Sequence, residues 1–393
     1  MGTLWIFNKI KHMQKTQKFI AIFFLIMMVS GCGDTLNEGG DSLVSLEKVV
    51  SITPDDQYQY GAFCRVNYVS GKDEFLVTFG GANRNVQEQY IDYNSDDMPG
   101  GAEGGNGYSY KFYSVDDFEY TGETGILNDS GGDAAFVMVD DEYFYSLGGH
   151  GGEIEWVINK YDASTLEEVD NVDIDLAEGE ITSDQMLAYA NGYLIASSLY
   201  DTNLALGGDR SSGSATDDSG ATHNHVYDTD LNLIDYFILD DTPHSNGGYV
   251  VFQNGVYNYI TSTAFFGDLI VMQYDEDWNY LGVKNLGVYG QWAQGALYDE
   301  ETEYFYVAYN ELNKFGEDSY NPRGISLGIY DKNWNLVETV EVTKEVQEDG
   351  TKEGRPSVVL YDGKLYVSYD VSPADTDQDW QCEVSIYDVT VNL

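Results

Sequence analysis

The chain has few basic residues and few prolines. Its 393 residues contain 19 lysines and arginines against 67 aspartates and glutamates, so the formal net charge at pH 7 is −48. A surface this acidic repels nucleic acid and anionic lipid head groups, which excludes both as expected partners. High charge is also typical of disordered chains, but 33 Tyr, 17 Phe and 6 Trp with only 6 Pro favour a folded, all-β protein.

Long apolar runs are also scarce. Phe19–Val29 is an apolar run of 11 residues preceded by four lysines, which is typical of a signal peptide and too short to span a bilayer as a helix. The residues that follow, Val29-Ser30-Gly31-Cys32, resemble the lipobox of bacterial lipoproteins. That resemblance implies removal of residues 1–31, lipidation of Cys32 and a tether over residues 32–41. A secreted protein without an anchor is the alternative.

The resemblance implies a place in the bacterial cell envelope, at the outer membrane, on its periplasmic side or at the cell surface. Removal of residues 1–31 takes away four lysines and no acidic residue, which leaves 15 basic against 67 acidic residues and a net charge near −52. Only Cys64 and Cys382 then remain as cysteines. In an oxidising compartment they could form a disulfide, and two free thiols are the alternative.

Six similar units follow one another along residues 42–393. Each has a pair of aromatic-rich strands around a tight turn, and most continue into a Tyr-Asp hairpin such as Tyr227-Asp228 or Tyr330-Asp331. Copies lie about 46–66 residues apart, close to the range of propeller blades. We therefore expect a six-bladed β-propeller of four-stranded antiparallel blades, with five or seven blades as alternatives.

The two ends of this domain predict how the ring closes. Only residues 389–393 follow Tyr387-Asp388, too few for a full outer strand, and a strand-like run at residues 43–52 precedes the first unit. We expect this N-terminal strand to complete the last blade, which removes an exposed edge. Gly80-Gly81 and Gly148-Gly149 resemble the glycine doublets of kelch repeats, and this resemblance covers the first two blades.

Polar residues near the start of each inner strand are expected to converge on the mouth of the central channel. The predicted ring is Arg65, Asp133, Asp184, Asn246, Gln294 and Arg355, with His244 and Trp292 beside it and Tyr60 and Tyr249 as stacking aromatics. Such a ring could orient a sugar, a small acid or a peptide end, and a water-filled channel without a ligand is the alternative. A register slip of one residue would turn any of these side chains to the other face.

Metal binding is weakly indicated, and no cofactor is predicted. Asp228-Thr229-Asp230-Leu231-Asn232 imitates the start of a calcium loop but lacks the later glycine and glutamate of an EF-hand, so turn capping is expected and Ca²⁺ is the alternative. His223 and His225 could form a metal pair on one face of a strand. Exposed polar strand positions are the expected explanation.

The common catalytic motifs are missing. The sequence has no Gly-x-Ser-x-Gly, no phosphate-binding glycine loop and no His-Glu-x-x-His. Arg355-Pro356 is similar to part of the Arg-x-Pro motif of propeller sialidases, but their Asp-box turns are absent. We therefore expect a monomeric, non-catalytic binder of a glycan, peptide or protein. A glycoside hydrolase or polysaccharide lyase that uses Asp133, Asp184 and Arg355 is the alternative.

Overall fold

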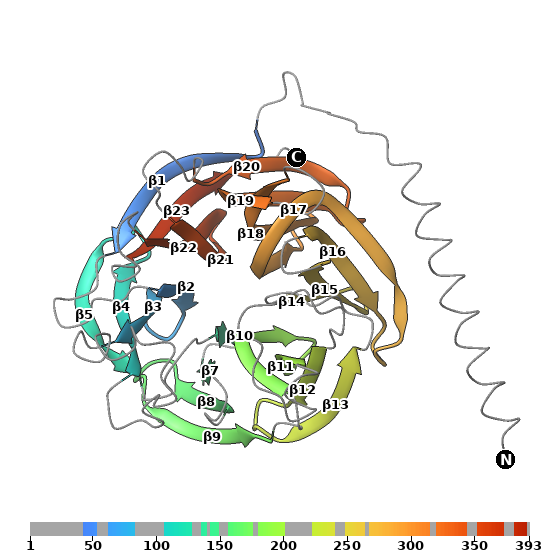
Figure 1. Ribbon diagram of the computed structural model, residues 1–393. Helices are drawn as coiled ribbons and strands as arrows, with labels where there is room; N and C mark the ends of the chain where they lie inside the picture. Colours follow the sequence, from blue (N-terminus) through green and yellow to red (C-terminus); the bar gives the residue numbers. More distant parts are fainter. Residues whose placement is uncertain are drawn as a thin grey trace, which may run out of the picture. The chain divides into compact units, whose positions relative to one another are not determined.

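Antiparallel strands make up the described chain. A computed structural model describes residues 42–52, 62–82, 106–127, 135–139, 142–148, 156–175, 180–200, 222–239, 248–263, 267–314, 320–343, 352–372 and 381–390. These residues contain β-strands and no helix, and Leu43–Leu393 is one compact unit. The sheets stand around a central axis like the blades of a propeller (Figure 1). The predicted all-β propeller is confirmed.

The first three sheets along the chain have four strands each. Within each sheet the strands lie in chain order from the axis to the rim. The first has β2 (Ala62–Val69), β3 (Glu74–Ala82), β4 (Asn106–Ser114) and β5 (Tyr120–Leu127). The second has β6 (Ala135–Met138), β7 (Tyr143–Gly148), β8 (Trp156–Asp162) and β9 (Glu168–Ile174). The third has β10 (Glu180–Ala190), β11 (Tyr193–Tyr200), β12 (Thr222–Tyr227) and β13 (Leu233–Leu239).

The next sheet has seven strands instead of four. It contains β14 (Tyr249–Gln253), β15 (Val256–Ser262), β16 (Gly267–Tyr274), β17 (Tyr280–Asp299), β18 (Tyr304–Lys314), β19 (Tyr320–Asp331) and β20 (Leu336–Glu341). In place of six separate four-stranded blades, the described residues form four such sheets and this larger one. The difference arises because β17 is continuous: it pairs with β16 from Tyr280 to Gly290 and with β18 from Gly290 to Asp299.

The last four-stranded sheet joins the two ends of the domain, as predicted. It contains β21 (Lys352–Tyr361), β22 (Lys364–Ser372), β23 (Gln381–Val389) and, on its outer edge, β1 (Val44–Ile52). β1 runs antiparallel to β23, with Val44 opposite Val389 and Ile52 opposite Cys382. The N-terminal strand therefore covers the edge that the C-terminal strand would otherwise expose.

Apolar side chains from the turns before the outer strands fill the spaces between neighbouring sheets. Five of these turns contain a large apolar residue with a positive φ: Phe118, Leu166, Leu231, Trp278 and Trp334. Leu231, for example, packs with Tyr145 and Leu147 of the preceding sheet. Four of these turns thus anchor their sheet to the one before it, and Trp334 packs on earlier strands of its own seven-stranded sheet.

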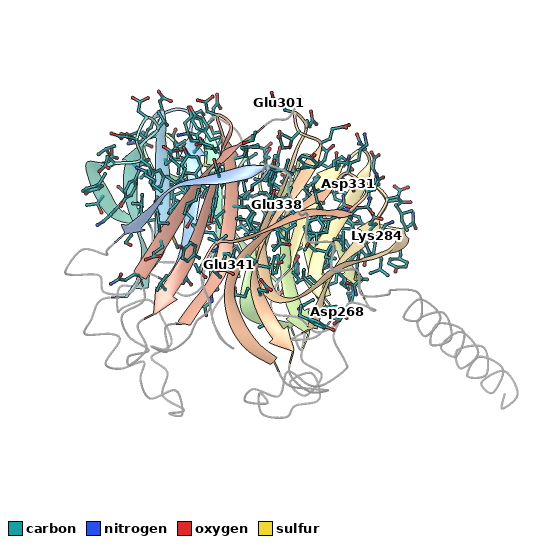
Figure 2. The ribbon with its side chains drawn as sticks, turned by 90° about the horizontal axis from the view of Figure 1, so that it is seen from above. Asp268, Lys284, Glu301, Asp331, Glu338 and Glu341 are labelled. Carbon is teal, nitrogen blue, oxygen red and sulfur yellow. A yellow bond between two sulfur atoms is a disulfide. The ribbon has the colours of Figure 1, made fainter. Side chains whose placement is uncertain are left out.

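β1 supplies the corresponding contact at the closing sheet. Val44 is buried in the cluster that contains Ile325 and Leu327 of β19. The turns themselves lie at one end of the sheets, where Figure 2 labels Glu301 and Asp331, whereas Asp268 lies toward the other end. The short turns therefore form one face of the propeller.

Candidate functional site

The inner strands enclose a cavity of about 410 Å³ on the propeller axis. It is lined by Arg65, Asn67, Tyr68, Val137, Met138, Met186, Leu187, Tyr249, Gly295, Ala296, Leu297, Tyr298, Asp299, Ser357, Val358, Val359 and Leu360. These residues come from β2, β6, β10, β14, β17 and β21, which surround the centre of Figure 1. The volume lies in the range of small-molecule pockets.

Arg65 and Asp299 lie at the two ends of this wall, and apolar side chains and Asn67 lie between them. Arg65 lies toward the start of β2, whereas Asp299 ends β17. The Asp299 carboxylate accepts hydrogen bonds from the backbone N–H groups of Glu301 and Thr302, each over 3.1 Å, and from the Thr302 hydroxyl over 2.6 Å. This carboxylate therefore caps the turn that follows its strand.

Four of the inner strands are irregular at the same end. The pairing register shifts in β2 between Ala62 and Arg65, in β10 between Ile181 and Met186, in β17 between Gln291 and Gly295, and in β21 between Gly354 and Ser357. Bulges of this kind redirect side chains and are common beside functional sites. The channel mouth is thus built from locally irregular backbone.

The strand pairing gives the level of each described ring residue. Arg65, Tyr249 and Ser357 each lie four residues before the last paired residue of their strands, so they share one level of the channel. Arg355 lies two residues further toward the mouth and has a φ of 51°. The predicted ring grouped Arg65 and Arg355 because the sequence locates the start of each inner strand only approximately.

The other predicted ring residues are described only in part. Asp184 lies in β10, and Trp292 and Gln294 lie in β17, at the bulges, but their side chains lie outside the described structure. Tyr60, Asp133, His244 and Asn246 lie outside the described residues altogether. The structure places the predicted aromatic residue Tyr249 at the level of Arg65 and adds Ser357 there.

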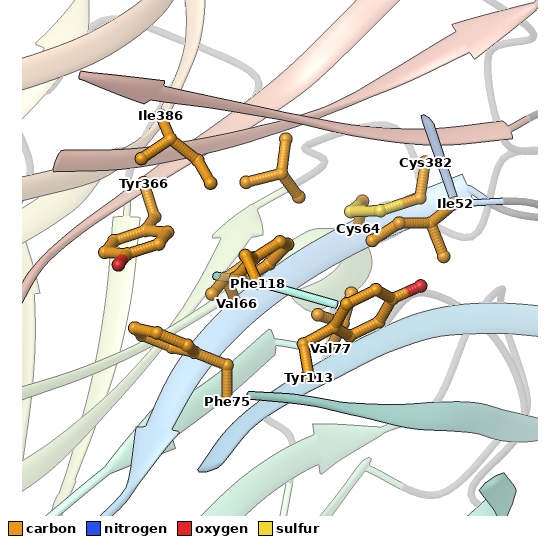
Figure 3. Close-up of a cluster of buried hydrophobic side chains, with 11 residues drawn as sticks. Ile52, Cys64, Val66, Phe75, Val77, Tyr113, Phe118, Tyr366, Cys382 and Ile386 are labelled. Atoms are coloured by element: carbon orange, nitrogen blue, oxygen red, sulfur yellow. A yellow bond between two sulfur atoms is a disulfide. The ribbon is translucent and has the colours of Figure 1, made fainter. Parts of the chain in front are cut away.

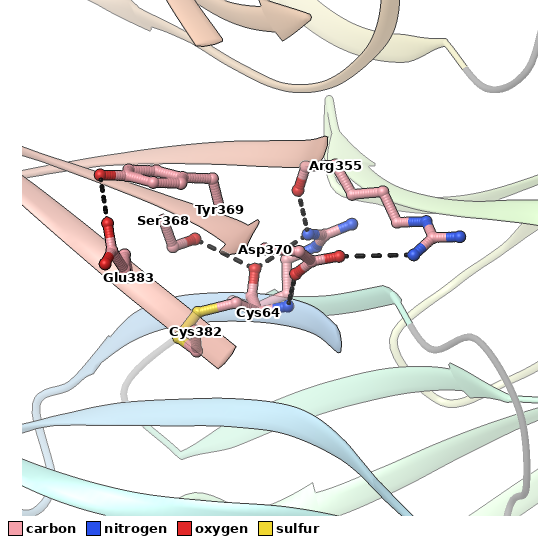
Figure 4. The surroundings of a disulfide bond; sticks show 8 residues. Cys64, Arg355, Ser368, Tyr369, Asp370, Cys382 and Glu383 are labelled. Atoms are coloured by element: carbon pink, nitrogen blue, oxygen red, sulfur yellow. Dashed lines mark hydrogen bonds and ion pairs between the residues drawn. A yellow bond between two sulfur atoms is a disulfide. The ribbon is translucent and has the colours of Figure 1, made fainter. Parts of the chain in front are cut away.

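Arg65 ties β2 to β21 at the mouth of the cavity. Its Nη1 donates hydrogen bonds to the carbonyl oxygens of Cys64 and Arg355, each over 2.9 Å (Figure 4). Arg355 Nη1 lies 3.4 Å from Oδ2 of the fully buried Asp370, and the other oxygen of Asp370 accepts the Cys64 N–H over 2.9 Å. The guanidinium of Arg65 is therefore held in place by fixed backbone groups.

A disulfide between Cys64 and Cys382 lies next to this network, with Cα atoms 5.4 Å apart. It sits in a buried cluster that includes Phe75, Phe118 and Tyr366 (Figure 3). Since β2 begins the first sheet and β23 belongs to the last one, the bond links the two ends of the ring. The structure thus pairs the two cysteines that the sequence left unassigned.

Tyr68 and Tyr249 of the cavity wall are hydrogen-bond donors at neutral pH. Burial raises the pKa of the Tyr249 hydroxyl, while the positive charge of Arg65 acts in the opposite direction. At the other end, the hydrogen bond with Tyr361 raises the pKa of Tyr68, and burial raises it further. Both phenols therefore keep their protons.

The proposed metal ligands have other roles in the described structure. Asp228 Oδ1 accepts the backbone N–H groups of Asp230 and Asn232, over 3.0 and 2.8 Å, and hydrogen bonds from Asn232 lower the pKa of Asp228. This geometry favours turn capping. Within the described ranges, no group of three His, Cys, Asp or Glu side chains is arranged to hold a metal ion.

His223 and His225 do not occupy the exposed positions expected from the sequence. Both are buried in β12. The hydroxyl of Tyr236 bonds with Nδ1 of His223, and the Tyr236 ring lies 4.8 Å from that of His225. The expectation was wrong because both faces of β12 are buried, and Tyr236 of the adjacent strand β13 contacts both imidazole rings. In the part of the chain that the structure describes, no helix has the length and apolarity to span a bilayer.

No protein-family model matches the chain, and no curated protein matches it in sequence. Among solved structures, it is similar to a Dyadobacter fermentans protein of unknown function, with 14% identity and a TM-score of 0.62 over 89% of this chain and 100% of that chain. It is also similar to Trypanosoma rangeli sialidase in complex with the inhibitor DANA, with 11% identity and a TM-score of 0.52. That match covers 87% of this chain and 60% of the sialidase. At these identities the similarity shows the fold alone, a β-propeller.

Proposed function

We propose that the chain is a lipid-anchored, extracytoplasmic β-propeller that binds a glycan, peptide or protein partner without catalysis. The observation that carries this proposal is the axial cavity, whose wall combines apolar side chains with Arg65, Tyr68 and Tyr249. Walls of this composition bind a ligand by burying its apolar surface and orienting it through a few polar groups. The lipobox-like segment at Cys32 supports the anchor.

We infer that the ring has six blades. β17 pairs first as an outer strand with β16 and then as an inner strand with β18, so the seven-stranded sheet is equivalent to two four-stranded blades that share one continuous strand. Each of these two blades would then bury its faces against the neighbouring blades, as the other four blades do. A monomer is the simplest state of such a ring.

Hydrolysis by two carboxylates has less support. Asp299 is the one acidic residue among the described residues that line the cavity, and its oxygens already cap a turn. Two-carboxylate hydrolysis requires a second acid about 5–9 Å away. Asp133 and Asp184 would be the candidates for that role.

A binding screen combined with a hydrolysis screen tests the proposal. The protein without residues 1–32, which keeps the compact unit Leu43–Leu393, is applied to glycan and peptide arrays and incubated with polysaccharides. We expect saturable binding without release of reducing ends. Val359→Trp should abolish binding by filling the cavity, whereas Lys332→Gln, on an exposed turn, should not affect it. Release of reducing ends that disappears in Asp184→Asn would establish an enzyme instead.

A further inference from the structure

The level of Arg65 combines a cation and a hydroxyl donor, next to a group of aliphatic side chains in the same channel. Arg65 and Tyr249 both line the cavity, four residues before the last paired residues of β2 and β14. Figure 1 shows these two strands on opposite sides of the axis. A ligand on the axis at this level would therefore meet a guanidinium on one side and a phenol hydroxyl on the other.

The Arg65 guanidinium is preorganised for an anion. Its Nη1 is fixed by the carbonyl oxygens of Cys64 and Arg355, and its side chain is only 6% exposed. A guanidinium offers five N–H donors in a rigid plane, which suits a planar carboxylate better than a flexible ammonium group does. Because little side-chain freedom remains to be lost on binding, this geometry favours affinity.

Below Arg65 the wall carries a group of aliphatic side chains beside the polar Asn67. Val137, Leu187, Leu297 and Val358 form this aliphatic group, and Asp299 lies at the far end. The aliphatic group gains free energy by removing the apolar surface of a ligand from water. The channel therefore suits a ligand that has one charged end and an apolar body.

We propose that the channel binds a small apolar carboxylic acid, with its carboxylate between Arg65 and Tyr249 and its body along Leu187 and Leu297. The free acid and the C-terminus of a short apolar peptide share this chemistry. The inference rests on the proposed binding function and narrows its ligand class.

Titration calorimetry with matched probes tests this subsite in the protein without residues 1–32. The probes are 3-phenylpropionate and N-acetyl-leucyl-leucine, each paired with its neutral amide, and glucuronate as a polar acid. We expect both acids to bind at least about 30-fold more tightly than their amides, because a hydrogen bond to a charged group is lost in the amide. Tighter binding of N-acetyl-leucyl-leucine would identify the natural ligand as a peptide C-terminus. Tighter binding of 3-phenylpropionate would identify it as a free acid.

The variants separate the subsite from the fold. Arg65→Gln should abolish the preference for acids, a loss of about 100-fold, and Tyr249→Phe, which keeps the ring, should weaken acid binding by about tenfold. Lys332→Gln is the matched control and should bind as the unaltered chain does. Since Arg65 also joins β2 to β21, the Tyr249→Phe result decides if Arg65→Gln does not fold.

Each remaining outcome overturns the inference. Equal binding of acids and amides, an acid preference that persists in Tyr249→Phe and Arg65→Gln, or tighter binding of glucuronate than of the apolar acids would each refute the subsite. In those cases the proposed function would still stand if another ligand bound to the unaltered protein but not to the Val359→Trp variant. If neither these probes nor the array ligands bind in the channel, both proposals are wrong.

Discussion

Replacing both Cys64 and Cys382 by serine is expected to lower the free energy of unfolding by about 4–5 kcal/mol. The two residues are 318 positions apart, so the bond removes much conformational freedom from the unfolded chain. The chain-entropy treatment gives about 6 kcal/mol for such a loop, and native disulfides commonly contribute somewhat less. Because whole domains are stable by only about 5–15 kcal/mol, this loss should be large in urea denaturation.

Reduction provides the control for this experiment. A reducing agent should destabilise the unaltered protein by a similar amount and leave the double-serine variant unchanged. The hydrogen bonds from the Cys64 N–H to Asp370 and from the Ser368 hydroxyl to the Cys64 carbonyl use the backbone of residue 64, so the variant retains them. Equal stability of the oxidised and reduced proteins would contradict the prediction and assign the closure to these polar contacts and β1.

A close approach of two inner strands gives a smaller prediction. A Cβ atom added to Gly295 would lie 2.4 Å from the Cα of Ser357 and 2.7 Å from the backbone nitrogen of Val358. Because the obstacle is backbone, Gly295→Ala should force β17 and β21 apart and cost about 1–3 kcal/mol in urea denaturation. Ala296→Gly, which adds no atom, should cost about 0.5–1 kcal/mol. A neutral Gly295→Ala would show that the two strands separate easily.

The tight turns and the ring closure could be predicted from the sequence because local chemistry determines them. Asn191, Asn254 and Asp362 have the positive φ that their Asn-Gly and Asp-Gly turns require. The spare strand at residues 43–52 and the short C-terminus indicated the β1–β23 pair correctly. Both features depend on a few adjacent residues.

The bulges could not be placed in the same way, since an extra residue in a strand has no consistent side-chain signature. Pro356 was the one local signal, because proline inside a sheet is confined to edges and bulges. Arg355 lies two residues nearer the mouth than Ser357, and Ser357 is the residue at the level of Arg65. The cavity depends on all six inner strands together, so no single segment could indicate its volume.

The apolar turn residues have a recognisable signal in the sequence. Leu231, Trp278 and Trp334 each lie three residues after the aspartate of a Tyr-Asp pair. A large apolar residue within a polar turn predicts burial against a neighbouring element, because exposing it to water is unfavourable. In the structure, these residues pack against the preceding strands of the ring.

Trp334→Ala should therefore destabilise the protein by about 3–5 kcal/mol, the usual cost of removing a buried tryptophan. The indole ring stacks on Phe305 with centroids 3.9 Å apart, and its Nε1 donates to Oδ1 of Asn258 over 3.0 Å. Asn258 lies in β15, on the neighbouring part of the sheet. The truncation thus removes both the packing and a buried hydrogen bond between them.

A double-mutant cycle with Asn258→Ala separates the two contributions. Asn258→Ala alone should cost about 1–3 kcal/mol because it leaves the indole N–H buried without that acceptor. The double variant should cost less than the two single changes together, by about 0.5–3 kcal/mol. Leu336→Ala is the matched control, since Leu336 follows the same turn but is 48% exposed, and it should change stability by less than about 0.5 kcal/mol. Additive costs, or an equal loss in Leu336→Ala, would mean that Trp334 does not join the two parts of the sheet.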